Sequence, residues 1–95
     1  MDLQELRKKI DDIDDKLVEL FEERMDVSAK IAEYKKEHNM PVFDPAREQQ
    51  KLCEISGKAK KKNIAYVAAL YSLLFDLSRA EQERVLRPEF GSVEK

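Results

Sequence analysis

The first long stretch of the chain, from about Leu3 to Lys36, contains neither glycine nor proline. Its apolar residues recur at alternating intervals of three and four, a heptad seam typical of a helix that packs along another helix. The pattern predicts one uninterrupted helix over about residues 3–36, roughly 50 Å long at 1.5 Å per residue. The seam positions are Leu3, Leu6, Ile10, Ile13, Leu17, Leu20, Val27, Ile31 and Tyr34.

Two further helices are predicted downstream. Asp44 and Pro45 form a typical helix start, with the aspartate as N-cap and the proline at the first helical position, and favour a helix over about residues 45–61. A third helix, over about residues 64–86, is apolar on more than one side and is therefore expected to be buried on several faces. Pro88 disfavours helical geometry at Arg87, so this third helix is expected to end there. We expect one domain over residues 1–88, with 89–95 a tail or the start of a linker.

The composition agrees with an all-α fold. The chain has 95 residues with only two glycines and three prolines, and its single cysteine, Cys53, excludes an intrachain disulfide. A compact domain of this length has a radius of gyration of only about 12 Å. A 50 Å helix therefore extends beyond any core that its own chain can build. We expect its exposed seam to pack against a second copy of the chain in a twofold homodimer.

The charge balance restricts the partners. The 18 basic and 20 acidic side chains give a net charge of −2, which argues against a general nucleic-acid binder. The lysine run at 58–62 is better explained as a solvated helix end, because no aromatic residue interleaves it. No apolar run is long enough to span a membrane and the charged N-terminus is unlike a signal peptide, so a cytoplasmic location is expected.

Polar residues interrupt the apolar stripes of all three predicted helices. Each taken alone has an ordinary structural explanation, such as register specification or helix-dipole chemistry. Together they define an inward set with net positive charge, and buried cations need an anionic partner. No metal-ligand cluster, Cys–His pair or glycine-rich phosphate loop accompanies the set, so a pocket of fixed hydrogen-bond donors without cofactor or metal is expected. The set comprises Arg24, Lys35, Arg47, Glu48, Ser78 and Gln82.

The order and spacing of these residues closely resemble the all-helical AroQ class of chorismate mutases, from Leu3 to about Leu86. The resemblance rests on the segments LRKKI (6–10), ER (23–24), AEYK (32–35), PVFDPARE (41–48) and SRAEQ (78–82). It implies an intertwined homodimer with two identical pockets and no cofactor, which converts chorismate to prephenate in phenylalanine and tyrosine biosynthesis. Chorismate is a dianion and matches the expected cationic pocket.

The resemblance also implies how the substrate carboxylates are bound. Arg24 and Arg47 correspond to the arginines that grip them, and Ser78 assists at one of them. Arg7 resembles the residue that reaches into the partner subunit's pocket, and its position beside the Leu6–Ile10 seam agrees with such a crossing.

The remaining site residues correspond to the groups around the reacting bond. Lys35 and Gln82 resemble the pair that donates hydrogen bonds to the ether oxygen as the C–O bond breaks. Glu48, with Lys35, resembles the contact to the ring hydroxyl. Asp44 matches the family's acid at the start of the second helix, where capping is its primary expected role.

Two alternatives stay open at this point. An isochorismate–pyruvate lyase shares this fold and a similar cationic pocket. A non-catalytic helical dimerisation module is the alternative of another class, although it leaves the inward polar residues unexplained.

Overall fold

The computed structural model describes residues 1–87, which form three α-helices and one 3₁₀ turn and contain no strand. The elements are α1 (Leu3–Glu37), α2 (Pro45–Lys58), η1 (Lys61–Asn63) and α3 (Ile64–Leu86). The predicted all-α class with one very long helix is confirmed. The predicted tail at 89–95 and the end of the predicted domain lie outside the described residues.

Helix α1 is continuous because nothing in its sequence interrupts it. The side chain of Asp2 caps its N-terminus by accepting a hydrogen bond from the Glu5 amide at 2.8 Å. The helix ends at a turn in which Asn39 takes a positive φ of 54°, a conformation that asparagine tolerates better than most residues. The Met40 amide then bonds back to the Lys35 carbonyl at 2.8 Å, which directs the chain toward α2.

Helix α2 begins as its sequence predicts but is shorter than expected. The Asp44 carboxylate accepts a hydrogen bond from the Arg47 amide at 3.1 Å, and Pro45 occupies the first turn. The helix ends at Lys58 rather than near residue 61, because Ala59 and Lys60 both adopt extended backbone conformations. Residues 61–63 form the 3₁₀ turn η1, which leads directly into α3.

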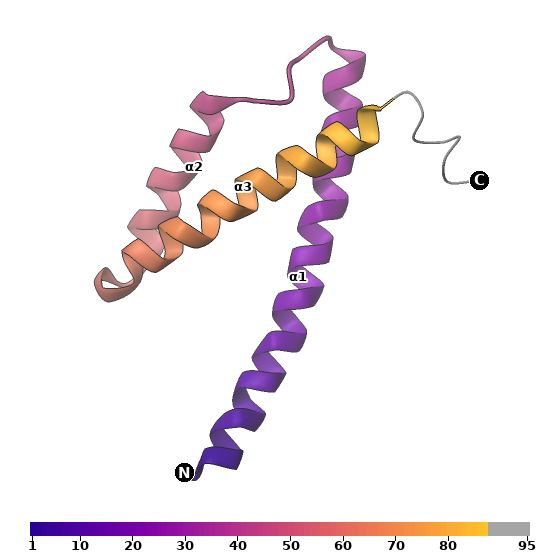
Figure 1. Cartoon of the computed structure of the whole chain (residues 1–95). Helices are drawn as coiled ribbons and strands as arrows, with labels where there is room; N and C mark the ends of the chain where they lie inside the picture. Colours follow the sequence, from indigo (N-terminus) through magenta and orange to yellow (C-terminus); the bar gives the residue numbers. More distant parts are fainter. Residues whose placement is uncertain (88–95) are drawn as a thin grey trace, which may run out of the picture.

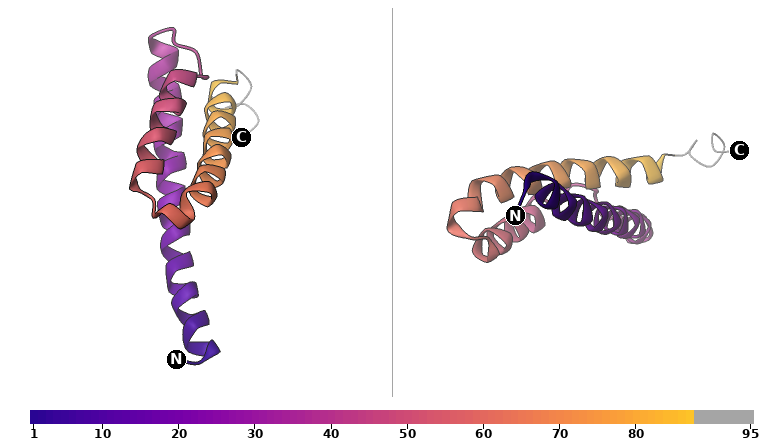
Figure 2. Two further views of the ribbon diagram at one scale, coloured as in Figure 1. Left: turned by 90° about the vertical axis from the view of Figure 1, so that its left-hand side faces the viewer. Right: turned by 90° about the horizontal axis from the view of Figure 1, so that it is seen from below.

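The three helices make an open arrangement rather than a compact bundle. Helix α3 crosses the C-terminal half of α1 and also packs against α2, whereas the N-terminal half of α1 projects away from both (Figures 1 and 2). The radius of gyration is 16.9 Å and the longest dimension is 53 Å. This radius of gyration exceeds the roughly 12 Å expected of a compact chain of this length.

The open arrangement leaves the described chain with almost no core. Ala32 is the one buried apolar residue among residues 1–87, and Ser28 and Gln82 are buried polar residues. The seam of the projecting half of α1 is instead exposed, with Ile10 and Leu17 each more than half accessible. Among residues 1–87, no helix combines the length and apolar character needed to cross a membrane.

Candidate active site

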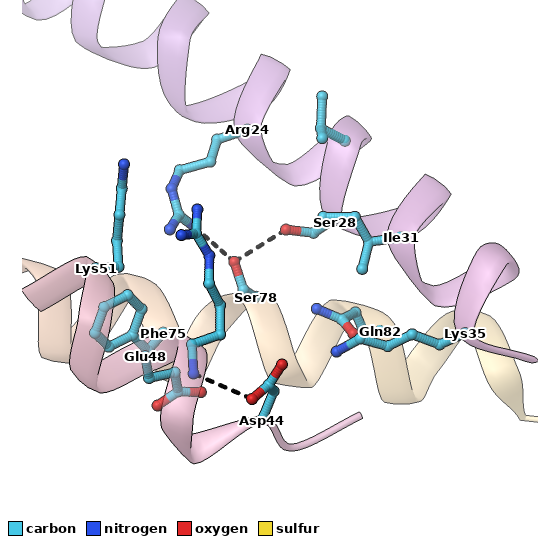
Figure 3. Close-up of a pocket in the computed structure, with 12 residues that line it drawn as sticks. Arg24, Ser28, Ile31, Lys35, Asp44, Glu48, Lys51, Phe75, Ser78 and Gln82 are labelled. Atoms are coloured by element: carbon cyan, nitrogen blue, oxygen red, sulfur yellow. Dashed lines mark hydrogen bonds between the residues drawn. The ribbon is translucent and has the colours of Figure 1, made fainter. Parts of the chain in front are cut away.

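All three helices contribute side chains to a pocket of about 320 Å³, at the crossing of α1 and α3 and the start of α2 (Figure 3). Seven of the eight residues predicted for the site line it. For six of them this follows from helix periodicity, because each lies where an apolar stripe continues onto the inward face of its helix, while Asp44 reaches the pocket from the N-cap of α2. The seven are Arg24, Lys35, Asp44, Arg47, Glu48, Ser78 and Gln82.

The Ser78 hydroxyl joins α3 to α1 at one wall of the pocket. Its oxygen accepts a hydrogen bond from Arg24 Nη1 at 2.5 Å and lies 2.9 Å from Ser28 Oγ (Figure 3). The Arg24 guanidinium also lies over the Tyr71 ring, 5.9 Å from its centroid. A hydrogen bond and a cation–π contact thus fix Arg24 in its orientation, which limits the entropy lost when a ligand binds.

Lys35 and Gln82 occupy the opposite end of the pocket, where their side chains extend toward each other (Figure 3). Lys35 Nζ donates a hydrogen bond to the Val42 carbonyl at 2.7 Å, so the ammonium group is held by the connection between α1 and α2. Gln82 is only 7% exposed, and its Oε1 has no hydrogen-bond partner among the described residues. A buried amide oxygen without a partner is costly and points to a polar ligand in this end of the pocket.

The first turns of α2 supply the remaining wall. The Asp44 carboxylate is engaged in capping, while Arg47 Nη1 donates to Gln50 Oε1 at 3.3 Å. Glu48 forms an ion pair with Arg79 of α3, and both side chains are about three-quarters buried. That contact is the largest cause of a raised pKa of the Arg79 guanidinium, which stays protonated at all relevant pH values.

The pocket favours an anionic ligand. Four cationic side chains line it, and its two carboxylates are already engaged, one by the α2 amide and the other by Arg79. Lys51 also lies 3.8 Å from a Glu54 oxygen on the same helix. Three of the four cations, Arg24, Lys35 and Arg47, therefore pair with no carboxylate among the described residues. Arginine matches carboxylate geometry through two parallel hydrogen bonds, so a ligand with more than one carboxylate fits this lining.

Arg7 is the predicted site residue that the structure leaves outside this pocket. It lies exposed on the projecting half of α1. Seventeen residues of continuous helix separate it from Arg24, which corresponds to about 25 Å along the axis. Arg7 therefore does not reach the pocket of its own chain, and its predicted crossing to a partner stays a prediction.

The structure also brings in residues that the sequence reasoning did not assign. Lys51 lies one turn beyond Arg47 and lines the pocket as a fourth cation, and Phe75 lines it from α3. The four-residue spacing from Arg47 was the available signal for Lys51. Arg79 belongs to one of the motif segments but was given no role, because its contact with Glu48 depends on how α2 and α3 pack.

The lining of the pocket consists chiefly of hydrogen-bond donors on polar and cationic side chains. Among residues 1–87, no group of three or more His, Cys, Asp or Glu side chains is placed to hold a metal ion. The pocket lining contains no cysteine or histidine, and its donors are guanidinium, ammonium, hydroxyl and amide groups. Such groups position an anionic substrate and stabilise charge that develops during a reaction.

Comparisons with known proteins agree with this chemistry. A family model described as chorismate mutase type II matches residues 6–83. A chorismate mutase from Methanocaldococcus jannaschii is 33% identical over 86 residues, which are 88% of this chain and 87% of that protein. No solved structure matches the chain significantly.

Longer relatives match as well. A bifunctional chorismate mutase/prephenate dehydratase from Buchnera aphidicola is 35% identical over 83 residues, which are 85% of this chain but 22% of that protein. The protein of the same name from Escherichia coli is 29% identical over 90 residues, 93% of this chain and 23% of that protein. This chain thus spans less than a quarter of these two relatives.

Proposed function

Because the chain belongs to the chorismate mutase type II family, we propose that it converts chorismate to prephenate by an intramolecular [3,3] rearrangement. One observation carries the proposal from the structure: cations from α1 and α2 and a buried amide from α3 line one pocket that suits a small dianion. The rearrangement breaks one C–O bond and forms one C–C bond within the same molecule. It needs no nucleophile, proton transfer or redox partner, and the pocket lining offers fixed donors for it.

Arg24 and Arg47 are proposed to bind the two carboxylates of chorismate, with Ser78 assisting beside Arg24. Their distribution over α1 and α2 supports this role, since two separated cations hold a flexible side chain over the ring. Bringing the two reacting carbons together in this way removes much of the entropic part of the barrier.

Lys35 and Gln82 are proposed to donate hydrogen bonds to the ether oxygen. Negative charge develops there as the C–O bond breaks, so both donors stabilise the transition state more than the bound substrate. By analogy with a single oxyanion donor, each contributes about 2–4 kcal/mol. Gln82 Oε1 is an acceptor, so its lack of a partner supports a polar ligand at this end of the pocket, whereas the proposed donor is the amide nitrogen of the same side chain. Glu48 is proposed to accept a hydrogen bond from the ring hydroxyl, and Asp44 to act mainly as the α2 cap.

We further propose a twofold, intertwined homodimer in which Arg7 completes the partner's pocket. The exposed seam on α1 supports the dimer: Leu6, Ile10, Ile13, Leu17 and Leu20 are between 46% and 62% exposed in the single chain. Burying such a stripe contributes about 25 cal/mol for each Å² removed from water. The distance of Arg7 from its own pocket agrees with a function across the interface. A cytoplasmic location also stays a prediction.

The test presents the purified protein separately with chorismate and with isochorismate and identifies the products by NMR. Prephenate formed from chorismate is the expected result. Release of pyruvate from isochorismate, without mutase activity, would instead identify a lyase of the same fold. Absence of turnover with either compound would leave a non-catalytic dimerisation module.

A matched pair of variants links that activity to the pocket. Arg24→Met removes a cation from the pocket lining and should reduce kcat/KM by at least about a hundredfold, in the range of a buried charged contact. Lys60→Met removes a cation from the exposed link between α2 and α3 and should leave turnover unchanged. Equal activity in the two variants would place the reaction outside this pocket.

A further inference from the structure

The Arg79 side chain contacts three parts of the molecule, and none of these contacts is accounted for by the proposed chemistry. Its guanidinium pairs with Glu48 on α2 and with Asp76 one turn earlier on α3. The same group lies over the Phe43 ring, 5.1 Å from its centroid, in the segment that leads into α2. Arg79 does not itself line the pocket.

The position of Arg79 beside Ser78 explains these contacts. Consecutive residues on a helix point about 100° apart, so they face different neighbours. Ser78 bonds to Arg24 and Ser28 of α1, whereas Arg79 bonds to Glu48 of α2. Helix α2 packs directly against α3 and not against α1 within residues 1–87. Arg79 therefore lies at the contact between α3 and α2, beside the α2 residues that line the pocket.

The charge environment of Glu48 gives this contact a consequence for binding. Glu48 shares the pocket lining with Arg47 beside it and Lys51 three residues further along α2, and with Arg24 and Lys35 from α1. Side chains three residues apart on a helix are neighbours. A Glu48 carboxylate without Arg79 would attract these cations, and they would then be unavailable to an anionic substrate. Arg79 engages the carboxylate without occupying the pocket.

On the basis of the proposed function, we propose that Arg79 is a positioning residue. It holds the Glu48 carboxylate at the pocket wall, aimed at the substrate's ring hydroxyl, and so keeps the pocket cations available for the substrate's carboxylates. Arg79 acts through Glu48 and does not touch the substrate. The effect of replacing Arg79 must then depend on the charge at position 48. If Arg79 had a merely structural role, the effect would be the same with either residue at that position.

The test is a double-mutant cycle measured as kcat and KM for chorismate. Arg79→Met alone should raise KM by about 5- to 50-fold, within the range of coupling between contacting charged residues, with a smaller effect on kcat. In a Glu48→Gln background the same change should alter KM by less than about twofold, because no carboxylate remains to capture the cations. Arg79→Lys keeps the charge but loses the planar fork, so it should recover part of the lost affinity.

Arg84→Met is the matched control, because Arg84 pairs with Glu81 on the same helix away from the pocket. It should leave KM unchanged. Thermal unfolding of each variant separates folding from binding, and Arg79→Gln replaces the methionine variant in both backgrounds if that variant does not fold.

The outcomes separate the two proposals. An equal rise in KM in both backgrounds, or an unchanged KM in active Arg79→Met, overturns the role of Arg79 and leaves the mutase assignment standing. A wild-type protein that does not convert chorismate refutes the proposed function itself.

Discussion

Replacing Gln82 by glutamate tests the proposed donor at the ether oxygen with almost no change in shape. A glutamine amide donates a hydrogen bond at every pH, whereas a carboxyl group donates only while it is protonated. Gln82 is 7% exposed, so a carboxyl introduced there is buried, and burial raises the pKa of a carboxyl group. A bound dianion in the same pocket raises it further, because two negative charges in one cavity repel each other.

The size of the effect follows from the protonated fraction. Above the pKa of a carboxyl group, its protonated fraction falls about tenfold for each pH unit. The kcat of Gln82→Glu should therefore fall by about a hundredfold over two such units. Steady-state kcat measured from pH 5 to 8.5 gives the profile, with wild type recorded in parallel. Gln49→Glu makes the same chemical change on the exposed side of α2, outside the pocket lining, and should follow the wild-type profile. A Gln82→Glu profile parallel to wild type would refute a hydrogen bond from position 82 to the reacting oxygen.

Three further changes test the other parts of the proposal. Lys35→Ala should lower kcat by about 10²- to 10³-fold, the loss typical of one oxyanion donor, and near-normal steady-state turnover would contradict its role. Ile13→Asp places a charge in the exposed α1 seam and should reduce the mass in sedimentation from two chains to one. Lys8→Ala, on the opposite face, should not change it, and a dimeric Ile13 variant would argue against the seam as the interface. The hydrogen bond from the Arg84 guanidinium holds the pKa of Glu81 below its ordinary value. The pair therefore stabilises the fold at a pH above that ordinary pKa, and this contribution is lost as the pH falls through the lowered pKa. Glu81→Gln should therefore weaken the acid dependence of Tm slightly, whereas an unchanged dependence would contradict the pair's contribution.

The helices were predictable because their signals are local. The apolar period of α1 and the cap formed by Asp44 and Pro45 are readable within one element, and the structure has both. The end of α2 was not predicted correctly, since the lysine-rich sequence from Lys58 to Lys62 is compatible with a helix. The extended backbone of Ala59 and Lys60 lets the chain turn into η1, a requirement set by the packing of α3 against α2.

The site was predictable only in part because its residues lie on three separate elements. Periodicity identified six inward polar positions on the three helices, and all six line one pocket. Their pairing depends on how the helices cross, which no local pattern specifies. The ion pair between Glu48 and Arg79 was therefore not predicted from the sequence. The roles of the site residues stay predictions, which the variants at Arg24, Lys35 and Gln82 test directly, and the crossing of Arg7 to a partner stays a prediction as well.

The pocket contacts predict how much each donor contributes to binding. Arg24 and Lys35 already donate to protein oxygens, at Ser78 and at the Val42 carbonyl. A substrate that takes these donors must replace existing hydrogen bonds, so only the difference between the two partners adds to affinity. Gln82 Oε1, by contrast, is an acceptor, and it has no hydrogen-bond partner to lose among residues 1–87. A ligand group that donates a hydrogen bond to this oxygen should therefore give a larger net gain than a contact to Arg24 or Lys35, whose existing bonds serve chiefly to hold these donors in place before the substrate arrives.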